Sequence, residues 1–211
     1  MRINSIVTNL NFQKIYKGKE PDPKNTVVIM GAAGDSDDIQ KYCKDCAEAT
    51  KALVLAGKNI LTGCGSFGIL GSAYNSAKEN SVKDDNGKPA QNLAIIKNPL
   101  WGDENQDECI VIGKADSEAE RIEDFENCAN TFVIYPGGAG TIQEAATLIF
   151  DNRYGDKDND IILVGKDYFK GLDLQYQTMY EMDQCKDPST LYEIVDSPND
   201  VIDKVLNKRA E

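Results

Sequence analysis

The chain has 211 residues, 41% of them apolar, so it is long enough and apolar enough to form one domain with a substantial core. It carries 23 Lys and Arg against 35 Asp and Glu, and the resulting net charge of −12 opposes binding to nucleic acid and to anionic membranes. It contains no histidine, which excludes Ser-His-Asp and Cys-His nucleophilic sites and histidine-based metal sites.

No segment of the sequence indicates export or membrane insertion. No run approaches about 18 apolar residues, the length that spans a bilayer, and the start MRINSIVTNLNFQ lacks the apolar stretch of a signal peptide. We therefore expect a cytoplasmic protein with no membrane partner and with reduced cysteines. Cys43 and Cys46 form a C-x-x-C pair, but no second pair at zinc spacing accompanies it. We interpret both as core residues of a helix and expect no metal and no cofactor.

Strands and helices are predicted to alternate along the chain. Residues 1–25 are polar, contain Pro21 and Pro23, and are expected to form an N-terminal arm ahead of a single domain, 26–211. The apolar run 26–33 indicates a buried parallel strand, and apolar residues at helical spacing follow it up to Gly57. The later expected strands are 59–62, 93–96, 108–112, 131–135, 161–164 and 192–195. The later expected helices are 72–80, 117–129, 141–152, 172–183 and 198–208.

This alternation predicts an α/β fold, a Rossmann-like three-layer sandwich with a parallel sheet of about six to seven strands. In open sheets of this kind, ligands bind outside the carboxyl ends of the strands. Three glycine-bearing loops are expected to leave the sheet at that edge, namely GAAGDS, TGCGSFGILG and PGGAGT. Their agreement predicts a single ligand site, with Gly31 of the first loop among its residues.

The loop PGGAGT, residues 136–141, predicts a phosphate site. Glycine lets a phosphate approach the bare backbone, and the start of the following helix offers unpaired N–H groups and a partial positive charge. We therefore expect one phosphomonoester to be held by Gly137, Gly138, Ala139, Gly140 and Thr141. A plain tight turn between a strand and a helix is the alternative.

The glycine-rich loop after the second strand is less specific. It lacks the terminal Lys-Ser/Thr pair of an ATP-binding loop, which disfavours ATP hydrolysis. Gly65 and Gly68 are candidates for contact with the ligand. Glycines that let the helix and the strand pack closely are an equal alternative.

Two charged residues are the candidates for catalysis, and each has an alternative interpretation. Glu144 lies one turn into the helix that follows PGGAGT, near the expected ligand, but Thr141-x-x-Glu144 is also a capping-box pattern. Arg121 is the single cation in an acidic helical run, SEAERIEDFE. The alternative for Arg121 is an exposed salt bridge.

The segment from Arg121 to Glu144 resembles the cytokinin-activating phosphoribohydrolases of the Lonely Guy family, which are often mislabelled lysine decarboxylases. The family motif PGGxGTxxE is matched by residues 136–144, its preceding arginine by Arg121, and its GGGxxGLMG-like segment by residues 63–71. The resemblance covers about residues 26–165.

The resemblance implies a Rossmann-like fold and a homodimer or higher homo-oligomer. It also implies hydrolysis of a nucleoside 5′-monophosphate, AMP or cytokinin-like, to free base and ribose 5-phosphate. Glu144 and Arg121 would form the catalytic pair, and the loop from Gly137 to Thr141 would hold the phosphate.

Three departures from the family pattern leave the base specificity open. Ile122 stands where the family commonly has Lys, Ala32 and Ala33 stand where it has two serines, and Phe150 aligns with the first residue of a Thr-Trp pair. The family also includes related proteins of similar fold. The alternative function is therefore a non-catalytic nucleotide- or molybdenum-cofactor-binding carrier protein.

Overall fold

The computed structural model describes residues 22–63, 65–81, 93–97, 110–114, 117–155 and 157–207, with the backbone alone for 93–97 and 110–114. The strands are β1 Thr26–Met30, β2 Asn59–Gly63, β3 Leu93–Lys97, β4 Ile110–Lys114, β5 Thr131–Ile134, β6 Asp160–Val164 and β7 Glu193–Val195. The helices are α1 Asp37–Leu55, α2 Gly68–Asn80, α3 Glu118–Cys128, α4 Ala139–Tyr154, α5 Lys166–Glu181 and α6 Pro198–Leu206. Short 3-10 helices span Pro23–Asn25 and Pro188–Thr190.

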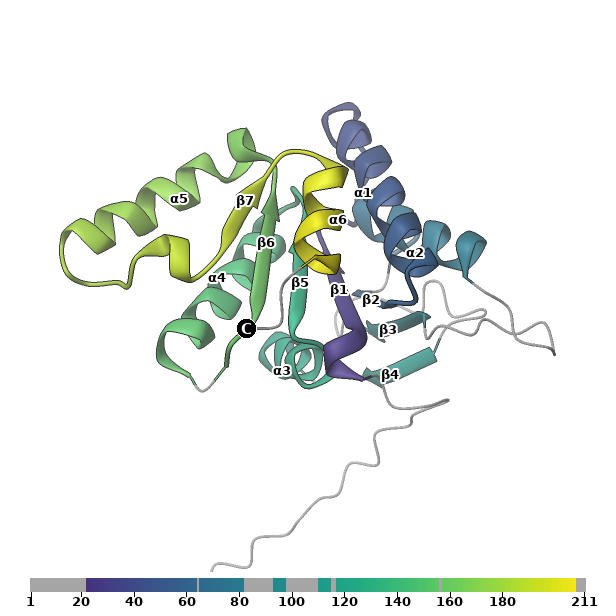
Figure 1. Ribbon diagram of the computed structural model, residues 1–211, viewed down its shortest axis with the longest axis horizontal. Coiled ribbons are helices and arrows are strands. Elements are labelled where there is room, and N and C mark those ends of the chain that lie inside the picture. Colours follow the sequence, from purple (N-terminus) through teal and green to yellow (C-terminus); the bar gives the residue numbers. More distant parts are fainter. Residues whose placement is uncertain are drawn as a thin grey trace, which may run out of the picture.

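The seven strands form one parallel sheet in the order β4-β3-β2-β1-β5-β6-β7 (Figure 1). The order reverses at β1, because β2 lies on one side of it and β5 on the other. The predicted α/β sandwich with its parallel sheet is confirmed. A reversal of this kind opens a crevice at the carboxyl ends of the strands, where such folds bind ligands.

The central strand β1 is buried on both faces, as its continuous apolar sequence predicts. Val27 and Ile29 pack into one hydrophobic core with α1, α2 and α6. Val28 and Met30 pack into a second core with α3, α4 and α5. The helices therefore cover the sheet in two layers, and the sheet is the middle layer of the sandwich.

Several element boundaries differ from those expected from the sequence. The helix α2 begins at Gly68 and not at residue 72, α4 begins at Ala139 and not at 141, and α5 begins at Lys166 and not at 172. Of the expected strand 108–112, residues 110–112 belong to β4, and residues 108 and 109 lie outside the described residues. In α2 and α4 the reason is that loop glycines belong to the first turn of the helix.

Two further expectations concern the chain termini and the cysteines. Of the expected arm 1–25, residues 1–21 lie outside the described residues, so the division at residue 26 stays a prediction. Cys43 and Cys46 are free thiols that pack into the core on α1, as interpreted from the sequence. Within the described ranges, no helix is both long and apolar enough to cross a membrane.

Candidate active site

A cavity of about 390 Å³ lies at the carboxyl edge of the sheet, where the order of the strands reverses. The loops after β1 and β5 contribute to its wall, as do the end of β2 and residues of α2, α3 and α4. The lining residues are Met30, Gly31, Ala32, Ala33, Gly63, Leu70, Glu118, Arg121, Phe125, Gly138, Ala139, Gly140, Thr141, Gln143 and Glu144. The site expected from the three glycine loops thus corresponds to a real cavity.

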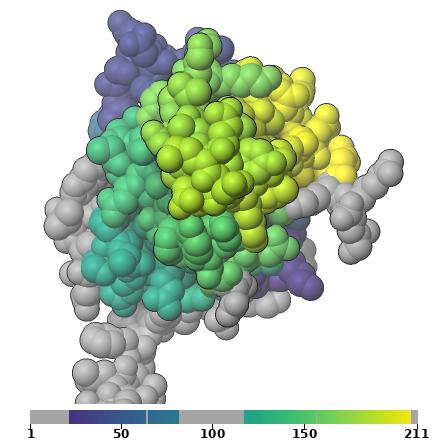
Figure 2. All heavy atoms as spheres, turned by 90° about the vertical axis from the view of Figure 1, so that its left-hand side faces the viewer, coloured from purple at the N-terminus to yellow at the C-terminus, as the bar shows by residue number. Residues whose placement is uncertain are grey.

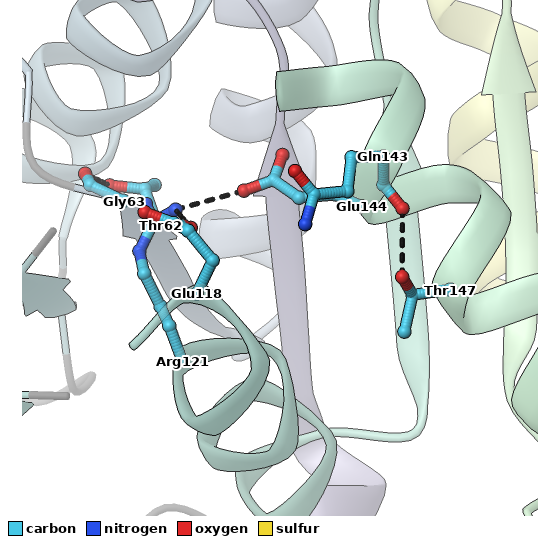
Figure 3. A network of polar contacts seen from close by, with 7 residues as sticks. All are labelled: Thr62, Gly63, Glu118, Arg121, Gln143, Glu144 and Thr147. Carbon is cyan, nitrogen blue, oxygen red and sulfur yellow. Dashed lines mark hydrogen bonds and ion pairs between the residues drawn. The ribbon is translucent and has the colours of Figure 1, made fainter. Parts of the chain in front are cut away.

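An ion pair between α3 and α4 lies in the wall of this cavity (Figure 3). Nη1 of Arg121 donates to Oε1 of Glu144 over 3.0 Å. Arg121 is only 6% exposed and Glu144 only 9%. The alternative that Arg121 is an exposed salt-bridge residue is therefore wrong.

The capping-box alternative for Glu144 is also wrong. The N-cap residue of α4 is Gly138, and no side chain caps this helix end. Because the helix begins at Ala139, Glu144 lies in its second turn, beyond the positions at which a side chain can return to the N-cap. Ala145 is fully buried in the core and fixes the orientation of this part of the helix.

Three neighbours hold Arg121 in place. Oε2 of Glu118 accepts a hydrogen bond from the same Nη1 over 3.2 Å. The guanidinium carbon lies 5.2 Å from the centre of the Phe125 ring. Gly63, at the end of β2, lies against Nη2 so closely that a Cβ atom there would collide with it.

The charge state of Glu144 is set by these surroundings. The pKa of its carboxyl group is raised to about 6, chiefly because the group is buried; the charge and hydrogen bond of Arg121 lower the pKa, and the charge of Glu118 raises it. Glu144 is therefore mostly ionised at pH 7 but accepts a proton more readily than an ordinary glutamate.

The predicted phosphate loop forms the opposite part of the wall. Gly138, Ala139, Gly140 and Thr141 line the cavity at the N-terminus of α4, where the first N–H groups have no partner within the helix. Cβ atoms at Gly138 and Gly140 would meet nothing within 4 Å, so the backbone is open to a ligand there.

Gly137 does not line the cavity, but close contacts around it fix the position of this loop. A Cβ atom at Gly137 would collide with Oγ1 of Thr141 and with the backbone nitrogen of Ala32. The hydroxyl group of Tyr168 on α5 donates to the carbonyl oxygen of Gly137 over 2.7 Å. The loop is thus fixed by β1 on one side and by α5 on the other.

Gly65 and Gly68 lie outside the cavity lining. Gly68 has a φ of 60°, and a Cβ atom there would collide with the carbonyl oxygens of Ala32 and Gly34. The backbone nitrogen of Ile69 donates to the same oxygen of Ala32 over 2.8 Å. These contacts favour the interpretation that Gly68 allows close packing.

Sequence reasoning did not assign to the site two cavity residues that contact Arg121, Gly63 and Glu118. Glu118 could have been identified from its spacing, because it lies three residues before Arg121 on the same helix. No local signal identifies Gly63, since its role depends on a side chain from α3.

The departures from the family pattern have different positions in the structure. Ile122 is 2% exposed and packs in the core, so its position does not face the cavity. Phe150 is 57% exposed and does not line the cavity. Ala32 and Ala33 do line it, so the missing hydroxyl groups affect the ligand site itself.

Solved structures with the same fold include molybdenum cofactor proteins. The molybdenum cofactor binding protein from Rippkaea orientalis is 17% identical, with a TM-score of 0.60 over 90% of this chain and 97% of that one. The Moco carrier protein from Chlamydomonas reinhardtii is 18% identical, with a TM-score of 0.56 over 90% of this chain and 100% of that one. At these identities the likeness shows the fold alone.

Sequence comparison gives the family. A search of curated proteins finds no match. The model of the family described as "Possible lysine decarboxylase" matches residues 70–205, which include α3, the phosphate loop and α4. This chain therefore belongs to the "Possible lysine decarboxylase" family, the group to which its PGGxGTxxE motif pointed.

Proposed function

We propose that the protein is a phosphoribohydrolase that cleaves the N-glycosidic bond of a nucleoside 5′-monophosphate, AMP or cytokinin-like, in the cytoplasm. The products would be the free base and ribose 5-phosphate. One observation carries the proposal: the buried Arg121–Glu144 ion pair and the N-terminus of α4 line the same cavity.

The charges in the cavity support one orientation of the substrate. Arg121 is paired with Glu118 and Glu144, so the three side chains together carry one negative charge in excess. A phosphate dianion is repelled there and is favoured at the N-terminus of α4. The ribose then lies beside Glu144, and the base lies against the apolar wall, to which Leu70 and Phe125 contribute.

In this orientation Glu144 has the properties that the reaction needs. As the bond from C1′ to the base nitrogen breaks, positive charge develops on the ribose, and a carboxylate beside it stabilises that charge. The oxygen of a water molecule bonds to C1′ and Glu144 accepts a proton from this water. The base leaves with the electron pair of the broken bond and takes up a proton from solvent, and Glu144 then returns its proton to solvent, so that the enzyme is regenerated. Arg121 keeps the carboxylate in position through the bond at Nη1.

The second candidate is a carrier that binds a nucleotide or the molybdenum cofactor without cleaving it. The fold shared with the molybdenum cofactor proteins favours this candidate. So do Ala32 and Ala33, which offer no hydroxyl groups to a substrate. The N-terminus of α4 suits the phosphate group of either ligand, so phosphate binding alone does not separate the candidates.

The test is incubation with a panel of nucleoside 5′-monophosphates and the matching nucleosides, followed by chromatography for free base. We expect base to be released from monophosphates and far less from nucleosides, because charge-assisted contacts to the phosphate are lost. Equal cleavage of AMP and adenosine would show that residues 137–141 do not bind the phosphate group of the substrate. Binding of AMP without any release of adenine would favour the carrier.

A further inference from the structure

Two carboxylates share one guanidinium nitrogen in this cavity. Nη1 of Arg121 lies 3.0 Å from Oε1 of Glu144 on α4 and 3.2 Å from Oε2 of Glu118 on its own helix (Figure 3). The exposed fractions of the side chains are 7% for Arg121, 12% for Glu144 and 28% for Glu118. Glu144 therefore shares the charge of Arg121 with Glu118.

Resting on the proposed function, we propose that Glu118 is a positioning residue of the site. It holds the guanidinium of Arg121 on the α3 side, so that Glu144 receives only part of its charge and remains able to accept a proton. A fully paired glutamate would be a poorer base, because an adjacent cation favours the ionised form.

The surroundings of Glu144 support this division of roles. Burial and the charge of Glu118 raise the pKa of Glu144, and Arg121 lowers it. Among the described residues, these two groups on α3 are the charged neighbours that influence Glu144, since the adjoining wall residues Thr141, Gln143 and Gly63 are uncharged. Glu118 is thus the residue that limits the effect of Arg121.

Glu118 is poorly placed for a purely stabilising role. Its second oxygen, Oε1, is buried and has no hydrogen-bond partner within the described part of the chain. A buried acceptor without a partner is unfavourable to the stability of the fold. A residue that served stability alone would be expected to use both oxygens.

The test is a titration of Glu144 by carboxyl carbon NMR in the intact protein, with the signal assigned by its absence in Glu144→Gln. In Glu118→Gln we expect the midpoint for Glu144 to fall by roughly one pH unit, because Arg121 then pairs with Glu144 alone. Glu118→Ala should give the same shift. Glu123→Gln is the matched control, because it removes an exposed carboxylate from the same helix and should leave the midpoint unchanged.

The rate of AMP cleavage provides a second readout. The acidic limb of the pH profile of kcat/KM should move to lower pH in Glu118→Gln, in step with the NMR midpoint. An unchanged Glu144 midpoint in Glu118→Gln and Glu118→Ala would overturn the role of Glu118, whatever the activity. Absence of cleavage by the wild-type protein would instead overturn the proposed function, and the titration would still decide the role of Glu118.

Discussion

Gly63 shows that the absence of a side chain at one position can determine where a functional group lies. It ends β2, lines the cavity and lies against Nη2 of Arg121. The guanidinium can occupy the space between Glu118 and Glu144 only because no Cβ atom fills it. We therefore assign Gly63 to the site, although it carries no chemical group.

Replacing Gly63 with Ala should reduce turnover and leave the fold intact. The new methyl group meets the far end of a flexible side chain, so Arg121 moves and the backbone does not. Misplacement of a catalytic group by about 1 Å can cost about 10²-fold in rate, and we expect a loss of that order for AMP cleavage.

Gly171→Ala is the control, because a Cβ atom at Gly171 on α5 would meet nothing within 4 Å. This variant should keep full activity and gain about 0.4–1 kcal/mol in stability. If Gly63→Ala cleaved AMP at the wild-type rate, the position of Arg121 would not matter for the reaction.

At this scale the sequence predicted Glu144 and Arg121 as site residues but not their surroundings. Glu144 and Arg121 follow from a motif, and the structure brings them together over 3.0 Å. The roles of Gly63 and Glu118 depend on contacts of one side chain, Arg121, with a strand end and with a second carboxylate. The contact of Gly63 is tertiary and leaves no local pattern, whereas Glu118 lies three residues before Arg121 on α3 and could have been identified from that spacing.

Among the elements, the loops after β1, β2 and β5 form one interlocked edge. Ala32 donates its N–H to the carbonyl oxygen of Pro136 over 3.0 Å and accepts from Ile69 over 2.8 Å. Gly68 makes this possible, because its positive φ and missing side chain let the start of α2 reach the loop after β1. The edge that holds the cavity is therefore stabilised by backbone contacts.

Gly68→Ala should destabilise the protein more than Gly57→Ala does. Both glycines have positive φ values, of 60° and 86°, and alanine costs about 1–2 kcal/mol in that region. At Gly57 the space is open, whereas at Gly68 the methyl group also meets two backbone carbonyl oxygens, which cannot move independently. Urea denaturation of both variants measures the difference. An equal decrease in the free energy of unfolding in both variants would show that the close contact of Gly68 with the loop after β1 does not contribute to stability.

The sequence predicted each element but misplaced three helix starts. Residues 68–71 and 139–140 were interpreted as loops because of their glycines, yet α2 and α4 begin there. The start of α5 was missed because Lys166 follows Gly165, whose φ of 108° takes the place of an ordinary N-cap side chain. In all three places a tertiary contact or a backbone turn replaces the usual local signal.

Over the whole molecule, charge and topology together support the predicted position of the phosphate. The chain carries a net charge of −12, so the electrostatic field of the whole protein does not attract a phosphate. The reversal of strand order at β1 places the N-terminus of α4 at the crevice and gives one local site of favourable charge. The alternation of strands and helices was enough to predict this edge, because parallel strands all end on it.

A candidate surface for the predicted homodimer lies on α4 and α5, and α5 lies across the middle of the face in Figure 2. Phe150 and Tyr154 on α4 are 57% and 61% exposed, and Leu174 on α5 is 64% exposed. Exposed apolar side chains on neighbouring helices are typical of interfaces. The oligomeric state itself stays a prediction.

The proposed reaction requires the negative charge of Glu144. Glu144→Gln keeps the size of the side chain and its ability to accept a hydrogen bond from Arg121, and it removes only the charge. The N-terminus of α4 is untouched in this variant, so AMP should still bind. The buried pair of Arg121 and Glu118 also remains.

The decisive measurement is the rate of adenine release from AMP by wild type and Glu144→Gln, with AMP binding followed by calorimetry in the same samples. We expect a folded variant that binds AMP as the wild type does and releases adenine about 10²–10³-fold more slowly, because the developing charge on the ribose loses its partner. A Glu144→Gln protein that releases adenine at the wild-type rate would contradict the role of Glu144.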